Sequence, residues 1–357
     1  RAVPCRVASP TNSLQDTSMV EPSTSRKKSR FWLYAPFVLL LILVGAWTAY
    51  WFIAKDQLDK GIDEWIAAER ANGAELEYSS KSLGGFPYRF ELVVNDPIYQ
   101  PAGAPRWEGE QLRLVMQPWN WQHVIAYSPG RNLLTEAGGL RQPVTLDKTS
   151  AASLSWNSDT IERIGLQMGN ATALIDGETY ATTGFSLNLK PREGAEDDLM
   201  IALQWDRLTI NAAPQGAEFL GDTIGPSRLI GEVRSFFPAW IRSGGNPERF
   251  HRALVQEDGA VEIAQGLLDW GPLDLGVKGD IKFDDGLAHG SLGMRIESAD
   301  ELRDALDASG QLGQQENAML TMLETSSADG GFLTFTIKDS EVRMGLIPVG
   351  TLPEPGY

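Results

Sequence analysis

The residue types most often used for catalysis are few and scattered in this chain of 357 residues. Its three histidines, His123, His251 and His289, stand apart from one another and outside zinc-binding spacings such as H-E-x-x-H. Ser227 lies in Gly-Pro-Ser-Arg, which lacks the closing glycine of a nucleophile elbow. The sequence has neither a Walker loop nor a G-x-G-x-x-G segment. We therefore predict no catalytic residues, no metal and no cofactor, and favour a protein that is not an enzyme.

Clustered carboxylates are the other candidates for chemistry. They occur at Glu196-Asp197-Asp198, at Asp284-Asp285 and at Asp329. Such clusters can bind calcium or form a catalytic pair, but acidic residues are also common in turns, and the spacing is not that of an EF-hand. We interpret them as solvated turns. An anchored hydrolase remains an alternative, and it requires two carboxylates that converge in a cleft, about 5–10 Å apart if it is glycosidase-like.

Tryptophans are more informative than the ionisable residues. Trp119 and Trp121 flank Asn120, so an extended segment would place both indoles on one face. Trp240 and Trp270 lie at the ends or in the interiors of expected strands. These rings are candidates for lining an apolar groove that binds acyl chains. The alternative is an ordinary core, because aromatic side chains bury a large area in any sheet.

The segment Gly-Gly-Phe-Pro-Tyr-Arg-Phe, residues 84–90, is a second candidate site. Its glycines allow a tight backbone path, and Pro87 fixes its own φ angle, so the following strand enters at a defined register. Phe86, Tyr88 and Phe90 add aromatic area, while Arg89 points away from Tyr88 and Phe90 in an extended segment. Arg89 could bind an anionic headgroup, or it could make a structural hydrogen bond.

An uncharged apolar run at residues 31–54 predicts a transmembrane helix. At 1.5 Å per residue this helix is about 36 Å long, enough to cross a hydrocarbon core about 30 Å thick. Aromatic residues that favour the headgroup level mark both ends, namely Trp32, Tyr34, Trp47, Tyr50 and Trp51. A cleaved signal sequence would have a shorter apolar core followed by small residues. We therefore expect an uncleaved anchor.

The charge distribution predicts the orientation of this anchor. Residues 1–30 form a basic tail with six Arg or Lys against two acidic residues, a net charge of +4, so the rest of the −16 chain carries −20. The positive-inside rule places this disordered tail in the cytoplasm. We also expect Met19 to be the native start. We therefore expect the protein to lie in the inner membrane, with its C-terminal domain in the periplasm. The acidic exterior argues against nucleic acid as a partner. Cys5, the single cysteine, lies in the tail, so the exported part has no thiol.

Beyond the span, the pattern predicts a helix and then mostly strands. Residues 55–73 have apolar positions at helical spacing that end at Asn72-Gly73, and we expect a juxtamembrane helix there. Residues 74–357 show repeated alternation of apolar and polar side chains, clearest at 273–283, with helical segments at 247–256, 299–308 and 314–325. Alternation is typical of antiparallel sheets. The expected fold is α+β and β-dominated, with a strongly twisted, curved antiparallel sheet and a few covering helices, and it could divide into halves at 74–215 and 216–357.

Several short motifs, in order along the chain, resemble one protein family. They are Gly84-Gly85-Phe86-Pro87-Tyr88-Arg89-Phe90, Pro118-Trp119, Ala239-Trp240 before Gly244-Gly245, Trp270-Gly271-Pro272-Leu273 and Leu346-Ile347-Pro348-Val349-Gly350. This order resembles the membrane-anchored alphaproteobacterial proteins grouped as domain of unknown function 2125, a family that implies no activity. The architecture also resembles AsmA-like envelope proteins, in which curved sheets form apolar grooves linked with lipid movement or envelope homeostasis.

These observations predict a single-span periplasmic protein that binds an apolar or lipid-like ligand or supports envelope homeostasis. Its expected partners are membrane lipid, through the anchor, and a lipid-like ligand. An interaction scaffold for other envelope proteins is the alternative. The candidate groove or motif residues are Phe86, Pro87, Tyr88, Arg89, Phe90, Trp119, Trp121, Trp240 and Trp270.

Overall fold

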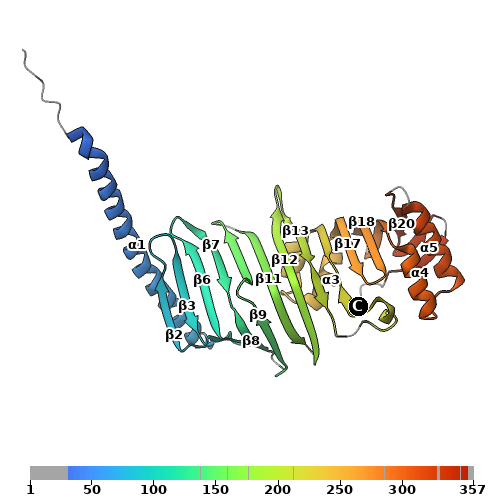
Figure 1. Ribbon diagram of the computed structural model, residues 1–357, viewed down its shortest axis with the longest axis horizontal. Coiled ribbons are helices and arrows are strands. Elements are labelled where there is room, and N and C mark those ends of the chain that lie inside the picture. The colour runs from blue at the N-terminus through green and yellow to red at the C-terminus, as the bar shows by residue number, and fades with distance from the viewer. Residues whose placement is uncertain are drawn as a thin grey trace, which may run out of the picture. The chain divides into compact units, whose positions relative to one another are not determined.

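The computed structural model describes residues 31–352, except positions 137, 159, 176, 212, 285, 328, 329 and 346, and except the side chains at 31, 32, 247 and 248. Cys5, Met19, Asp285, Asp329 and the predicted tail at 1–30 therefore lie outside the described residues. The chain divides into two compact units, residues 1–50 and 51–357. We call the second the sheet unit. Helix α1 (Phe31–Ala71) supplies the described part of the first unit and continues into the sheet unit (Figure 1).

The strands of the sheet unit form one sheet in which every described pairing is antiparallel. Its first half consists of two rows of short strands. The first row is β2 (Ser80–Gly84), β3 (Phe90–Asn95), β6 (Gln111–Gln117), β7 (Asn120–Tyr127) and β10 (Ala151–Trp156), paired in that order. The second row is β1 (Glu75–Glu77), β4 (Ile98–Gln100), β5 (Arg106–Gly109), β8 (Gly130–Thr135) and β9 (Arg141–Leu146).

Two long strands join the rows. β11 (Ile161–Ile175) pairs through its first part with β10 and through its second part with β9. β12 (Glu178–Arg192) likewise pairs with both β13 (Ala195–Trp205) and β14 (Arg207–Thr209). The change of partner on β12 falls at Gly184, whose φ of +67° is a backbone conformation that favours glycine. The sheet therefore bends at the positions where these long strands change partner.

Beyond β12 the two rows converge into a single series of strands. β16 (Ser227–Arg234) continues the first row and β15 (Thr223–Ile224) the second, and both pair with β17 (Ala260–Trp270). The series then continues through β18 (Leu273–Asp284), β19 (Leu287–Ile296), β20 (Leu333–Lys338), β21 (Glu341–Met344) and β22 (Ile347–Thr351).

Strand register places apolar side chains on one continuous face of the sheet. Directly paired residues in antiparallel strands point to the same side. One lane of successive Cα partners reads Leu92, Leu114, Ala126, Ala152, Leu166, Leu187, Leu203 and Leu229. The neighbouring lane reads Phe90, Met116, Val124, Leu154, Ile164, Leu189 and Ile201. The opposite face carries polar residues such as Arg113, Gln167 and Asn188. We call the side of the two lanes the apolar face.

Helices pack on this apolar face near the C-terminal end. α4 (Ala299–Ala308) and α5 (Gln314–Ser327) form a core with the sheet that includes Ile296, Leu302, Leu320 and Phe335. α2 (Phe236–Arg242) and α3 (Pro247–Gln256) form a smaller core, in which Ala239 and Leu254 are buried and Val233 and Val261 pack against them. A short 3-10 helix, η1 (Glu218–Leu220), contributes Leu220 to the α4–α5 core.

The predicted fold class is confirmed: the chain is β-dominated, with an apolar N-terminal helix and a large antiparallel sheet. The three expected helices occur as α3, α4 and α5, but α2 was missed. Glu196, Asp197 and Asp198, interpreted from the sequence as a turn, instead lie in β13, and only Glu193 and Gly194 connect β12 to β13. The division of residues 74–357 into two halves stays a prediction.

Candidate functional site

The bent sheet and helix α1 enclose an apolar cavity of about 170 Å³ at the start of the sheet. Leu92, Leu112 and Leu114 line it from the first row of strands. Ile98, Tyr99 and Trp107 line it from the second row, and Ile62, Trp65 and Ile66 from α1. Because both rows contribute to one cavity, their apolar sides face each other across it. We call the hollow between the two rows the trough.

Polar contacts fix α1 over this part of the trough. Lys81 on β2 forms ion pairs with Asp59 at 2.9 Å and Asp63 at 2.5 Å, both on α1. The Tyr99 hydroxyl donates a hydrogen bond of 3.0 Å to Glu69 Oε2. Burial alone would lower the pKa of Lys81, but its bonds to the two aspartates raise it, so the ammonium stays charged. The polar groups hold the helix, while its apolar side chains line the cavity.

The trough continues into the middle of the sheet unit. A second apolar cavity of about 110 Å³ is lined by Ala126, Leu146, Ala152, Leu166 and Met168. Leu146 comes from the second row and the other residues from the first row or from β11. Along the lanes that lead away from this cavity, Ile164 remains 39% exposed and Leu229 36%. Apolar side chains in the middle of the sheet are thus accessible.

The hydrogen-bonded Asp147 holds the corner between β9 and β10. Its carboxylate accepts hydrogen bonds from the Ser150 hydroxyl at 2.8 Å, the Thr149 hydroxyl at 2.9 Å and the Asn170 amide nitrogen at 2.8 Å. Partial burial acts to raise the pKa of Asp147, but these donors outweigh it and lower the pKa to about 2. The side chain therefore links the corner to β11, directly beside the second cavity.

At its C-terminal end the trough is filled. The core under α4 and α5 includes Trp270, Leu275, Met294 and Leu333 as partly buried members, and the last three occupy the apolar face. The Trp270 indole donates a 3.0 Å hydrogen bond to the Gly221 carbonyl, which fixes the ring at this end. The apolar face is thus lined by α1 at its start, accessible in the middle and covered by helices at its end.

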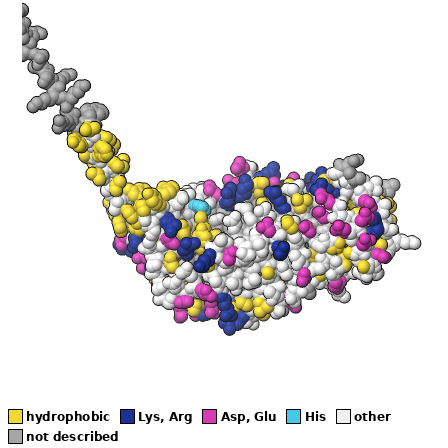
Figure 2. Space-filling view, viewed as in Figure 1, with side chains coloured by type: hydrophobic (Ala, Val, Ile, Leu, Met, Phe, Trp, Pro, Cys, Tyr) yellow, Lys and Arg dark blue, Asp and Glu magenta, His cyan; other side chains and the backbone are white. Residues whose placement is uncertain are grey.

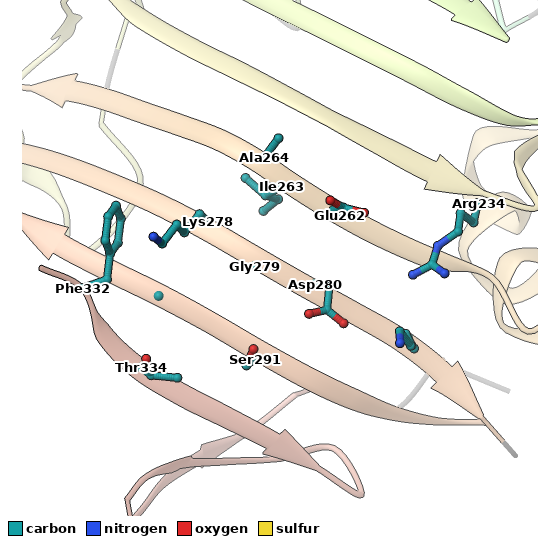
Figure 3. A pocket seen from close by; sticks show the side chains of 12 residues that line it. Arg234, Glu262, Ile263, Ala264, Lys278, Gly279, Asp280, Ser291, Phe332 and Thr334 are labelled. Atoms are coloured by element: carbon teal, nitrogen blue, oxygen red, sulfur yellow. The ribbon is translucent and has the colours of Figure 1, made fainter. Parts of the chain in front are cut away.

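The opposite face carries a wide depression of about 520 Å³ with charges of both signs (Figure 3). Glu262 on β17 and Asp280 on β18 are direct cross-strand partners, and Arg234 and Lys278 also line the depression. The Lys278 ammonium lies 4.0 Å from the centre of the Phe332 ring, a cation–π contact. This polar surface suits hydrated solutes and not acyl chains.

Five of the nine candidate residues gather at the turn between β2 and β3. The cis Phe86–Pro87 bond, Tyr88 and Arg89 occupy the turn between β2 and β3, and Phe90 begins β3. Arg89 forms an ion pair of 2.7 Å with Glu91. Tyr88, which we expected inside a strand, lies in the turn. The buried Phe90 ring stacks on Trp51 with their centres 5.3 Å apart.

The remaining candidates fall in three places. Trp119 lies in the turn between β6 and β7, so it is not in an extended segment with Trp121, and the Trp121 ring lies 5.2 Å from Phe90. Trp240 on α2 stacks with Phe236 at 6.1 Å. Trp270 is part of the α4–α5 core. The structure thus gathers seven candidates around the β2–β3 and β6–β7 turns and leaves two elsewhere, and their functional role stays a prediction.

Trp107, Ile62 and Trp65 line the first cavity but were not among the nine candidate residues. A signal was present in the next strand, because Leu112 and Leu114 alternate with the polar Gln111 and Arg113. The carboxylates named from the sequence have mixed roles: Asp284 is exposed, whereas Asp198 accepts a 3.0 Å hydrogen bond from the Ser235 amide. Among the described residues, no three metal-ligating side chains cluster.

Comparison with known proteins identifies a family but no activity. No curated protein and no solved structure matches the chain. Residues 51–353 match the family described as "Uncharacterized protein conserved in bacteria (DUF2125)". The matched segment begins with Trp51, which packs against Phe90, and it includes the whole trough. The chain therefore belongs to the DUF2125 family of bacterial proteins.

Proposed function

We propose that this protein is a membrane-anchored binder of a lipid-like ligand, whose acyl chain lies along the trough. The observation that carries the proposal is the apolar lane from Leu92 to Leu229, which crosses the first row and the strands that follow it and is exposed at Ala152 and Leu229. Ordinary antiparallel sheets bury their apolar face against a second layer. An extended apolar face left accessible marks a binding site for an apolar partner.

The energetics suit an acyl chain. Burial of one methylene group contributes about 0.8 kcal/mol, so a chain with about ten buried methylenes gains on the order of 8 kcal/mol before the entropic cost of ordering it. The trough is elongated because each lane crosses successive strands about 4.8 Å apart. A linear hydrocarbon chain matches this shape better than a compact ring system does.

The apolar helix supports a location at a membrane. The described part of α1 from Leu33 onward is long and apolar enough to cross a bilayer. With the basic tail on the cytoplasmic side, the sheet unit extends into the periplasm beside the inner membrane. In this arrangement the sheet unit is tethered to a membrane, which is a source of acyl chains. The N-terminal helix and the trough are thus two separate observations, and both support the binding of a membrane lipid.

A substitution that blocks the trough tests the proposal. Ala152 is an exposed residue on the apolar face of β10, and Gln167 is an exposed residue on the polar face of β11. Ala152→Trp places an indole in the trough, while Gln167→Trp adds the same indole outside it. The full chain is purified in detergent, and the lipid that stays bound is extracted and quantified by mass spectrometry.

We expect wild type and Gln167→Trp to retain lipid at a defined ratio to protein and Ala152→Trp to retain at most one fifth of that amount. Thermal unfolding of both variants checks that each remains folded. Equal lipid in all three proteins, or none in wild type, would overturn the proposal. Crosslinking in cells that gave stoichiometric protein adducts, together with lipid-free wild type, would favour the scaffold alternative instead.

A further inference from the structure

We infer that the sheet unit also docks on the bilayer through an exposed aromatic surface. The surface consists of Phe52, Ile53, Phe86, Tyr88 and Trp119, and we call it the aromatic patch. Its partner is the lipid headgroup layer of the membrane that α1 crosses. This inference goes beyond ligand binding and rests on the anchor, not on the identity of any ligand.

The patch is exposed although its members are large and apolar. Tyr88 is 72% exposed, Trp119 58% and Phe86 48%. Figure 2 shows hydrophobic side chains gathered at the β2–β7 end of the sheet unit. Contiguous exposed apolar groups are unusual on a protein surface that faces only water, and they mark an interaction site. Trp and Tyr in particular favour the boundary between hydrocarbon and headgroups.

Strand register brings the two turns of the patch together. Phe86 and Tyr88 lie in the turn that precedes β3, and Trp119 lies in the turn that follows β6. The first residue of β3, Phe90, pairs with Met116 near the end of β6, so both turns project from the same end of neighbouring strands. The two turns therefore form one surface.

Contacts within the sheet unit tie this surface to the end of the apolar run. Phe86 stacks on Phe52 with their centres 5.7 Å apart and meets Trp51 edge-on at 5.3 Å. The Trp51 indole also donates a 3.3 Å hydrogen bond to the Arg89 carbonyl. Trp51, Phe52 and Ile53 are among the last residues of the apolar run 31–54. Where this run leaves the bilayer, the patch must therefore lie at the same level.

Contacts also connect the patch to the sheet. The buried Phe90 ring contacts both Trp51 and Trp121, and Phe90 begins the apolar lane that continues through Met116 and Val124. The aromatic patch is therefore held rigidly on the sheet unit, at the end of β3 and β6.

Spin labels on the full chain in phosphatidylcholine vesicles test the docking. In a Cys5→Ser background, which removes the single cysteine, a nitroxide is attached at Tyr88→Cys or Trp119→Cys. Gln167→Cys, exposed on the polar face, is the water-facing control, and Leu41→Cys in the apolar run is the membrane control. Collision rates with oxygen and with a water-soluble nickel chelate report the depth of each label.

We expect the labels at 88 and 119 to collide at least threefold more often with oxygen, relative to the nickel chelate, than the label at 167. If the labels at 88 and 119 show the collision rates of a water-exposed label while the label at 41 shows those of a membrane-buried one, the docking is overturned and the anchor remains supported. Aqueous values at all four positions would overturn both. Neither result depends on whether the trough holds lipid, so failure here is distinct from failure of the proposed function.

Discussion

Asp147 shows how one carboxylate can stabilise a bend in a long sheet. It follows β9 directly, and its oxygens accept bonds from Thr149, Ser150 and Asn170, which joins three segments at one corner. Asp and Asn are common in turns because their short side chains bond to nearby backbone groups. From the sequence Asp147 is one turn carboxylate among many, because its partner Asn170 lies 23 positions away.

We predict that Asp147→Ala destabilises the sheet unit by about 1–2 kcal/mol at neutral pH, since a partly buried network of charge-assisted hydrogen bonds is lost. The exposed Asp284→Ala is the matched control, and its effect should stay within about 0.5 kcal/mol. Denaturant unfolding followed by tryptophan fluorescence measures both values. Equal stability of the two variants would show that Asp147 does not hold the corner.

The low pKa of Asp147 makes the stability of the fold depend on pH. The folded value is about 2 against an ordinary value of 3.8, so the carboxylate stabilises the fold above about pH 4. This contribution is lost as the pH falls from 4 toward 2, because the unfolded chain binds the proton first. The difference in stability between wild type and Asp147→Ala should therefore shrink over that range. A constant difference would mean that the charge of Asp147 is not what stabilises the corner.

At the scale of elements, the strands that were predicted well are the long ones with clear alternation. The segment 273–283, which has the clearest alternation, lies entirely within β18. The second-row strands β1, β4 and β5 have three or four residues each, too few to show a period. Helix α2 was missed because its seven residues include Pro238 and a run of aromatics, which gives no amphipathic pattern.

The α4–α5 pair closes one end of the trough, and its packing can be tested by Leu320→Ala. Leu320 is buried in the core shared with Ile296 and Phe335, so we expect a loss of about 2–4 kcal/mol. Met322→Ala on the exposed side of α5 should cost less than about 0.5 kcal/mol. Hydrogen exchange should speed up in α4 and α5 for Leu320→Ala alone. Unchanged exchange would indicate that these helices are held by other contacts.

At the scale of the whole molecule, the sequence predicted the class of fold and suggested an apolar groove, but not which residues line the trough. The apolar face depends on which strand pairs with which, and these partners are long-range: Leu92 meets Leu114, and Leu166 meets Leu187. The bend depends on local corners such as Gly184 and Asp147, which have ordinary sequence signatures. Trp119 was expected in an extended segment, but it lies in a turn. This turn lies beside Phe86 and Tyr88 because of strand pairing, which the sequence alone does not show.

The central claim is that an acyl chain occupies the trough, and light-induced crosslinking in cells tests it most directly. A benzophenone amino acid replaces either Leu187 or Asn188, which are neighbours on β12 and point to the apolar and polar faces respectively. Cells grown with radiolabelled fatty acid are irradiated, and label bound covalently to the protein is measured. The account predicts strong labelling at 187 and at most one tenth of it at 188. Equal labelling at both positions, or none at 187, would contradict it.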